Sequence, residues 1–122
     1  MALASSSAPV PPALTILRTR YASQLPARLD DLAGPAHGTV DLPLHVVWSG
    51  LRSFDVDHPK LRMSLYRTVL AEGLRQDLET FLNRDLLISQ WPVLRTLISR
   101  PIREVWEDAF PELIATRAAT AA

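Results

Sequence analysis

The sequence predicts a mainly α-helical protein: a compact bundle of short helices with one extended or strand segment near residues 39–48. Between residues 57 and 113, apolar side chains recur at spacings of three and four, which places them on one face of a helix. Prolines and glycines interrupt this pattern repeatedly, and each interruption ends a helix after a few turns. Residues 39–48 alternate between apolar and polar instead, as the side chains of a strand do.

The composition fits one small domain and excludes several classes of function. A chain of 122 residues can form one domain around one core. Its 13 basic and 13 acidic residues balance, which argues against non-specific binding to nucleic acid or to anionic lipid but leaves room for a local basic face. The chain has no cysteine, which excludes disulfides and thiolate chemistry. No apolar run approaches the roughly 20 residues of a membrane-spanning helix, so we expect a cytoplasmic protein with no membrane partner.

Three regions are expected along the chain. Residues 1–12 are rich in alanine, serine and proline and are predicted to form a disordered N-terminal segment. Residues 13–113 are predicted to form a single helical domain whose core comes from residues 57–113. The alanine-rich residues 114–122 are predicted to be a frayed C-terminal tail.

The part before residue 57 contains weaker signals. Residues 13–25 carry a modest helical stripe, and residues 27–33 could form a short helical turn closed by Gly34-Pro35. In the extended segment, Pro43 favours a position at a sheet edge, because proline cannot donate a ladder hydrogen bond. A strand needs a partner, and residues 53–56 are the one other candidate in the chain.

Two helices are predicted over residues 57–82. Asp57 is the expected N-cap of the first, with Pro59 in its first turn. Gly73 is expected to end this helix in the left-handed conformation. The second helix covers residues 74–82, and Leu74 is expected to face the core.

Further helices follow from residue 83. Asn83 is the expected cap of the next helix, and Pro92 and Pro101 each precede a new apolar period. Pro92 is therefore predicted to begin a helix over residues 92–98, and Pro101 to begin one over residues 101–110. The last helix has the clearest apolar stripe, formed by Ile102, Val105, Trp106, Ala109 and Phe110.

The sequence contains no pattern typical of a metal or cofactor site. His37, His45 and His58 are too widely spaced for a metal motif, and each is expected to be a satisfied or surface histidine. Asp55, Asp57 and His58 form the densest group of metal-ligand types, but helix capping by Asp57 explains it without a cation. We therefore expect no metal and no cofactor.

Catalytic patterns are absent from the sequence as well. Ser49-Gly50 lacks the preceding Gly-x of a nucleophile elbow, and the glycines are too dispersed for a phosphate loop. Glu72, Asp77 and Glu79 are expected to be surface carboxylates of helices. The expectation is a protein with no catalytic residues that is not an enzyme.

The last two predicted helices suggest an alternative function in DNA binding. Residues 92–98 and 102–110 resemble a helix-turn-helix in outline, and Arg95, Arg100 and Arg103 could contact phosphates. Acidic side chains on the second helix would oppose this contact: Glu104, Glu107 and Asp108. Two helices of a bundle therefore remain the favoured interpretation, and nucleic acid is the less favoured partner.

The same region offers candidate residues for binding another protein. Tryptophan and arginine are enriched among the residues that contribute most to protein interfaces. We expect Trp91, Arg95, Arg100 and Arg103 to be the candidate partner-binding residues. Trp91 is preferred to Trp106, because Trp106 lies in the middle of an apolar stripe. The pairs Arg100–Glu104 and Arg103–Glu107, each spaced by four, are expected to form a solvated face.

Three stretches of the chain have the character of motifs: LPLHVVWSG at 42–50, SLYRTVLAEG at 64–73 and QWPVLRTLISRPIREVWEDAFPEL at 90–113. They contain a Trp-Ser-Gly element, a helix ending in Glu-Gly, and a Trp…Pro…Arg…Trp…Phe-Pro-Glu-Leu ending. In these motifs residues 29–113 resemble a family of small uncharacterised actinobacterial proteins. Some members look like antitoxin partners of nucleotidyltransferase-type toxins, and a few carry transcriptional-regulator labels. The resemblance implies a regulatory protein partner and assigns no role to any residue.

The leading hypothesis is a non-enzymatic, cytoplasmic protein-binding or regulatory module, antitoxin-like in the sense of this resemblance. It depends on the zero net charge, the missing catalytic pattern and the extended segment, which could add to the sheet edge of a partner. The alternative is a DNA-binding transcriptional regulator that uses the helix pair at residues 92–110. An enzyme would require His58 to converge with carboxylates in a pocket.

Overall fold

The structure is a computed structural model that describes residues 12–47 and 50–114. The predicted disordered segment at 1–12 lies outside the described residues except for its last residue. The predicted tail at 114–122 lies outside them except for its first. Trp48 and Ser49 of the Trp-Ser-Gly element are outside them as well.

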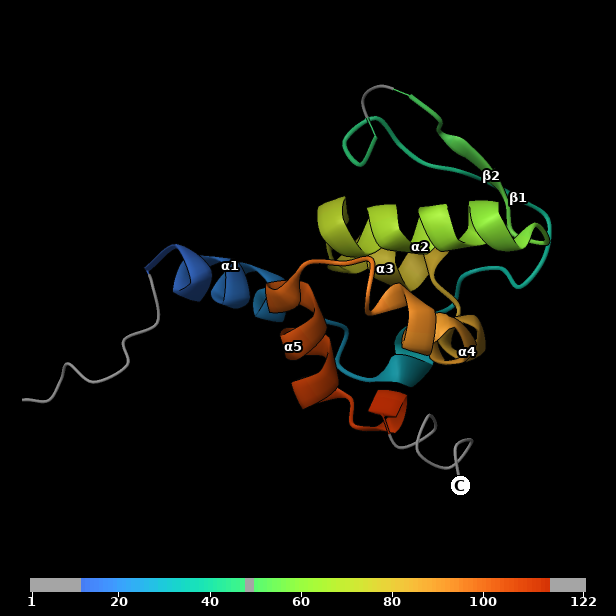
Figure 1. Ribbon diagram of the computed structural model, residues 1–122. Helices are drawn as coiled ribbons and strands as arrows, with labels where there is room; N and C mark the ends of the chain where they lie inside the picture. The colour runs from blue at the N-terminus through green and yellow to red at the C-terminus, as the bar shows by residue number, and fades with distance from the viewer. Residues whose placement is uncertain (1–11, 48–49, 115–122) are drawn as a thin grey trace, which may run out of the picture.

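Helices make up most of the described chain, and a two-stranded antiparallel sheet lies above them in Figure 1. The mainly α-helical fold class predicted from the sequence is confirmed. The elements in chain order are α1 (Pro12–Ser23), the 3-10 helix η1 (Leu29–Asp31), β1 (Thr39–Asp41), β2 (Ser53–Asp55), α2 (Pro59–Glu72), α3 (Arg75–Phe81), α4 (Arg84–Leu94) and α5 (Arg100–Ala109). None of the described helices is both long and apolar enough to cross a membrane.

Aromatic side chains from α4 and α5 form the centre of the core. Trp91 and Trp106 are 0% and 2% exposed, and their ring centroids lie 6.5 Å apart. Phe110 continues the cluster at 5.4 Å from Trp106. The same buried cluster also includes Leu29 and Phe54, so the core is not confined to residues 57–113 as the sequence analysis expected. The strands and η1 are part of the same hydrophobic unit as the helices.

The strand segment is shorter than predicted, and its partner is the weak candidate at residues 53–56. β1 pairs with β2 in antiparallel register, with Val40 opposite Phe54. After Asp41 the chain leaves the sheet and turns, because the carbonyl of Pro43 accepts hydrogen bonds from the N–H groups of Val46 and Val47 at 3.0 and 3.1 Å. The predicted alternation over 39–48 therefore stops at the turn.

Two expectations for the ends of α2 are wrong. The N-cap is His58, whose Nδ1 accepts a hydrogen bond from Leu61 N–H at 3.4 Å. Asp57 instead accepts hydrogen bonds from His37 and from the N–H of Gly38. Gly73 has φ −80°, so it is not left-handed. Glycine is required there because a Cβ would lie 2.7 Å from the carbonyl oxygen of Val69.

The helix predicted over residues 92–98 does not exist separately, because α4 continues through Pro92 to Leu94. Leu87, Trp91 and Leu94 are all buried on one face of α4. A proline inside a helix costs about 3 kcal/mol, and the burial of this face, with a whole tryptophan in it, opposes that cost. Pro92 resembles a helix start in the sequence, but the tertiary packing of this face keeps it inside α4. The predicted cap at Asn83 is confirmed, since its side chain accepts a hydrogen bond from Leu86 N–H.

A tight junction ties the segment after η1 to the end of α3. The N–H groups of Ala33 and Gly34 donate to the carbonyls of Glu79 and Leu82 at 2.8 and 2.7 Å. A Cβ on Gly34 would lie 2.4 Å from the carbonyl carbon of Phe81, so only glycine allows this approach.

The buried hydroxyl of Tyr66 supports the same junction. It accepts a hydrogen bond from Asn83 N–H at 2.8 Å. Desolvation by burial raises the pKa of Tyr66 to about 12, although the backbone of Asn83 and the charge of Arg62 oppose the shift. The neutral phenol is therefore the form that the fold stabilises.

We expect Gly34→Ala to lower the free energy of unfolding by about 2–3 kcal/mol, because the added methyl group collides with backbone that cannot move easily. Gly38→Ala is the matched control. At that position a Cβ meets no atom within 4 Å, and only the φ of +90° is unfavourable, so the loss should be about 1 kcal/mol. Urea denaturation of both variants measures the two losses and tests whether Gly34→Ala is the more destabilising. Equal losses would show that the chain at residue 34 moves away without penalty.

We expect Tyr66→Phe to destabilise the fold by about 1–2 kcal/mol, because the N–H of Asn83 loses its acceptor. The pKa of Tyr66 rises from 10.0 to about 12 on folding. Wild-type stability should therefore fall as the pH rises above about 10, since the folded state holds a proton that the unfolded state releases. The variant should lose this component of the fall, whereas Tyr21→Phe should keep it. Denaturation curves across alkaline pH measure the difference, and the same fall in all three proteins would contradict the assignment.

Candidate functional site

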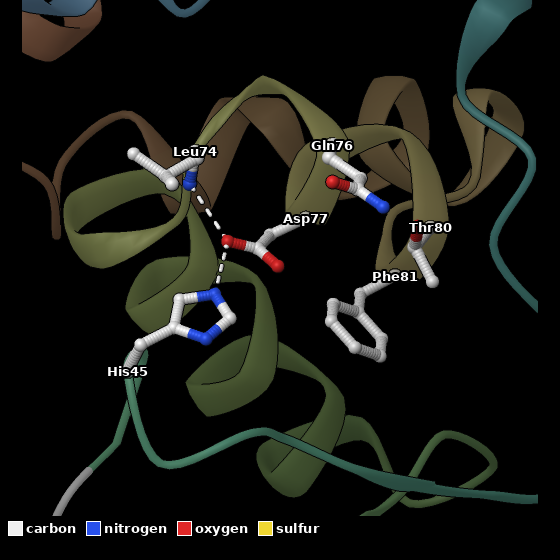
Figure 2. Close-up of a pocket in the computed structure, with 6 residues that line it drawn as sticks. All are labelled: His45, Leu74, Gln76, Asp77, Thr80 and Phe81. Atoms are coloured by element: carbon white, nitrogen blue, oxygen red, sulfur yellow. Dashed lines mark hydrogen bonds and ion pairs between the residues drawn. The ribbon is translucent and has the colours of Figure 1, made fainter.

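A pocket of about 330 Å³ lies between the turn that follows Pro43 and the helix α3. Figure 2 shows the residues that line it, which are His45, Leu74, Gln76, Asp77, Thr80 and Phe81. His45 comes from the turn, Leu74 precedes α3, and the other four belong to α3. The turn that ends the strand segment early is thus the feature that brings His45 to this pocket.

Asp77 is at the base of the pocket and is only 7% exposed. Its Oδ2 accepts hydrogen bonds from Leu74 N–H at 2.9 Å and from Nε2 of His45 at 2.8 Å. A carboxylate in the first turn of a helix is favoured by the free N–H groups and by the helix dipole. The local sequence therefore fixes Asp77 through helix capping, and His45 then docks on the same oxygen.

The second carboxylate oxygen of Asp77 is free to act on a ligand. Among the described residues, the hydrogen bonds of Asp77 all involve Oδ2, and Oδ1 has no partner. Figure 2 shows this oxygen turned toward the open space between the rings of His45 and Phe81. This oxygen is open to solvent through the pocket, although the residue as a whole is only 7% exposed.

Two sequence expectations about this pocket are wrong and one agrees with the structure. Asp77 was expected on the helix surface, yet it is buried. Leu74 was expected to face the core, yet it is 54% exposed and forms part of the pocket wall. His45 is a satisfied histidine, as expected, with Asp77 as its partner. The one signal that could have revealed Asp77 is its position in the first turn of a helix, where an acidic side chain caps backbone N–H groups.

The pocket contains groups suited to binding. Leu74 and Phe81 provide apolar wall, and Gln76 and Thr80 provide an amide and a hydroxyl. Within the described part of the chain, the Thr80 hydroxyl is not hydrogen-bonded to His45, so no nucleophile is paired with a base here. The arrangement can hold an apolar stem that ends in a hydrogen-bond donor.

The predicted partner-binding residues near α5 form a second cluster, and it is mostly internal. Trp91 is 0% exposed, so its side chain lies inside this fold, and partner binding through it stays a prediction. Its Nε1–H donates to Oε2 of Glu107 at 2.9 Å, and Nε of Arg95 donates to the same oxygen at 2.6 Å. Arg103 donates to the carbonyl of Arg95 at 3.3 Å. The buried indole N–H of Trp91 requires an acceptor inside the protein, and the carboxylate of Glu107 is placed to accept its hydrogen bond.

Opposing effects act on the pKa of Glu107. Burial alone would raise this pKa, but the hydrogen bonds from Arg95 and Trp91 and the charges of Arg95 and Arg103 hold it below its usual value. The same hydrogen bond from Arg95 to Glu107 raises the pKa of Arg95. Both groups are therefore charged at neutral pH, and the pair stabilises the packing of α4 on α5.

The other expected ion pairs are only partly present. Arg100 and Glu104 form the predicted pair four residues apart at 2.7 Å, and Arg18 of α1 reaches the same carboxylate. The expected pair of Arg103 with Glu107 is replaced by the pair of Arg95 with Glu107. Arg100 keeps a 73% exposed side chain, whereas Arg95 is 27% exposed. Arg103 is half-buried, so Arg100 is the most exposed of the three arginines proposed to contact DNA phosphates.

The cluster around Asp55 has structural tasks. Asp55 accepts a hydrogen bond from Asp57 N–H at 2.9 Å, and Asp57 pairs with His37 at 2.6 Å. The hydrogen bond from His37 is the main cause of the lowered pKa of Asp57. His58 caps α2. In residues 12–47 and 50–114, no three side chains of metal-ligand type come together.

We expect Glu107→Gln to lower the free energy of unfolding by about 2 kcal/mol near neutral pH, because Arg95 loses its charged acceptor. The folded-state pKa of Glu107 is below its ordinary value of 4.5. The contribution is therefore present above about pH 4.5 and is lost as the pH falls through the folded value. Denaturation curves at several pH values should show the two proteins converging in acid. The exposed neighbour Asp108 gives the control Asp108→Asn, which should leave the curve unchanged, and a difference that stays constant in acid would contradict the assignment.

Comparisons of this chain with protein-family models, with curated proteins and with solved structures find no match. The resemblance to small actinobacterial proteins therefore stays a prediction from the three sequence motifs. The candidate site is defined by its geometry, with His45 on Asp77 at the base of the pocket and Leu74 and Phe81 in its wall.

Proposed function

We propose that this chain is a cytoplasmic, non-enzymatic protein-binding module that recognises its partner at the pocket between His45 and α3. The observation that supports the proposal is an open pocket with apolar wall and one unpaired carboxylate oxygen at its base. Sites of this kind hold a ligand through a few placed polar groups and apolar contact area.

Exposed apolar side chains at this surface also favour a protein partner. Leu74 in the pocket wall is 54% exposed, and Leu44, adjacent to His45 in the chain, is 60% exposed. Single exposed leucines are common on protein surfaces. Here Leu74 lines the pocket and Leu44 precedes a lining residue in the chain, and a covering polypeptide would remove such side chains from water.

The partner that we propose is a nucleotidyltransferase-type toxin, with this chain as its antitoxin. Support for this identity comes from the motifs at 42–50, 64–73 and 90–113, in which the chain resembles such partners. The motif at 42–50 includes His45, which lines the pocket. A binding surface at this turn would thus include part of the motif.

The geometry gives less support to the alternative of a DNA-binding regulator. Its first helix was to cover residues 92–98, but Pro92 belongs to α4 and residue 95 already lies beyond that helix. Its arginines already have acceptors within the protein, with Arg95 on Glu107 and Arg100 on Glu104.

Affinity capture of the tagged full-length chain from its host tests the proposal, with bound protein and nucleic acid both identified. We expect a nucleotidyltransferase-type protein in about equal amount, retained in high salt. Coexpression with that protein should relieve its effect on growth. The variant Leu74→Ser should weaken capture, and Ile16→Ser, which alters a side chain that is 68% exposed on α1, should not.

Other results would redirect the function. A stoichiometric protein of another class would reject the antitoxin identity and keep the binding module. Nucleic acid recovered without a protein, and released steeply by salt, would favour the regulator instead. Loss of that nucleic acid in a variant lacking Arg95, Arg100 and Arg103 would assign it to the helix pair.

A further inference from the structure

We infer that the pocket between His45 and α3 is a receptor for a single cationic side chain, an arginine or lysine of the partner protein. The inference deepens the proposed function and rests on it, because it names the chemistry by which the partner is recognised. It depends on the unpaired oxygen of Asp77 and on the position of this oxygen in the pocket.

Asp77 has no arginine or lysine partner within the described protein. Its partners are a backbone N–H and the imidazole of His45, at 2.9 and 2.8 Å. No lysine or arginine among residues 12–47 and 50–114 forms an ion pair with it. Arg75, the nearest arginine in the sequence, donates to the carbonyl of Ser23 at 2.9 Å. The pocket base therefore holds a carboxylate with no permanently charged cation of the described residues beside it.

Burial makes this charge selective for a cation. The side chain of Asp77 is only 9% exposed, so its carboxylate meets solvent only where Oδ1 opens into the pocket. A cationic donor that reaches Oδ1 would use an acceptor site that no described residue occupies and would offset the charge of the carboxylate in the same contact. Hydrogen bonds between ionised groups are about twice as strong as neutral ones.

The walls of the pocket fit the rest of such a side chain. Arginine and lysine have apolar stems that pack along apolar surface while the charged end reaches a polar group. Leu74 and Phe81 provide that surface. Figure 2 places the Phe81 ring beside the open space that Oδ1 of Asp77 faces, where the face of an aromatic ring attracts a cation.

A polypeptide is the source that the surroundings favour over a free small cation. Leu74 is 54% exposed and Leu44 is 60% exposed, and a free cation would leave both in water. A partner chain that inserts one side chain would cover them at the same time. The His45 imidazole holds Oδ2 of Asp77, so the oxygen offered to the partner is fixed in place.

Nuclear magnetic resonance with two capped amino acids tests the pocket directly. The isotope-labelled full chain is titrated with acetyl-arginine methylamide and with acetyl-citrulline methylamide, which has nearly the same shape but no charge. Mildly alkaline buffer keeps imidazoles neutral. We expect saturating shifts of the backbone signals of Leu74, Gln76 and Thr80 with the arginine compound, and binding at least about tenfold weaker with the citrulline compound.

Matched variants show whether Asp77 is responsible. Asp77→Asn can still accept from Leu74 and His45 while it presents an amide in place of the charged oxygen. It should abolish the preference for arginine, and its melting curve shows whether it remains folded. Glu72→Gln, an exposed carboxylate two residues before Leu74, removes the same charge and should keep the preference. Equal shifts with both compounds, or an unchanged preference in folded Asp77→Asn, would overturn the inference.

The captured partner separates this inference from the proposed function. If Asp77→Asn lowers the affinity of that partner about tenfold and Glu72→Gln leaves it within about twofold, the pocket receives a cationic side chain. A partner bound equally well by folded Asp77→Asn rejects the receptor and leaves the binding module intact. Arginine binding at the pocket with no protein captured would reject the module and identify the ligand as a free cation.

Discussion

The burial of Trp91 is the constraint on which the C-terminal half of this fold depends. The indole must pack against Trp106, which keeps α4 helical through Pro92 to Leu94. Its N–H must find an acceptor away from water, and the carboxylate of Glu107 provides it. A carboxylate in that position needs a positive charge, which Arg95 supplies. One aromatic side chain thus accounts for a helix boundary, a buried acid and the orientation of an arginine.

Asp77 is held in place by hydrogen bonds from a backbone N–H and from a histidine, and not by an arginine of the described chain. Its position in the first turn of α3 satisfies the N–H of Leu74, and the turn after Pro43 brings His45 to the same oxygen. These contacts fix the carboxylate but leave its second oxygen unpaired among the described residues. Glu107 is paired with an arginine, whereas Asp77 is paired, within the described chain, only with the imidazole of His45 and a backbone N–H, and its second oxygen stays open. The difference explains why the cluster near α5 is structural while the pocket on α3 is the candidate site.

Local signals in the sequence predicted much of the fold. The apolar spacing revealed the helices, Asn83 marked a cap, and the weak strand candidate at 53–56 proved to be the partner of β1. The errors at Asp57 and Pro92 share a cause, because they depend on contacts between distant parts of the chain, with His37 for Asp57 and with Trp106 for the helix that contains Pro92. Pro92 resembles a helix start until the burial of Trp91 is known.

The candidate site was harder to predict than the fold. Leu74 fits the apolar spacing of α3, and Asp77 resembles any exposed helix carboxylate in the sequence. His45 is 32 positions away from Asp77 in sequence. These residues form a pocket only because the turn after Pro43 places His45 against α3. No local pattern in the sequence encodes the contact of His45 with α3. The sequence therefore suggested Trp91 and three arginines as candidate binding residues and did not reveal this pocket.

The packing of α1 on α5 has a consequence for how the chain matures. Figure 1 shows the first described helix lying beside the last, and Arg18 contacts Glu104 across this interface. During synthesis α1 leaves the ribosome first, but its docking surface is made only when residues 100–109 have followed. Domains with such distant contacts form them late and slowly. Tyr21 of α1, which packs against the core in the folded chain, therefore stays uncovered for nearly the whole of translation, and this is the interval in which a chaperone or a binding partner can reach it.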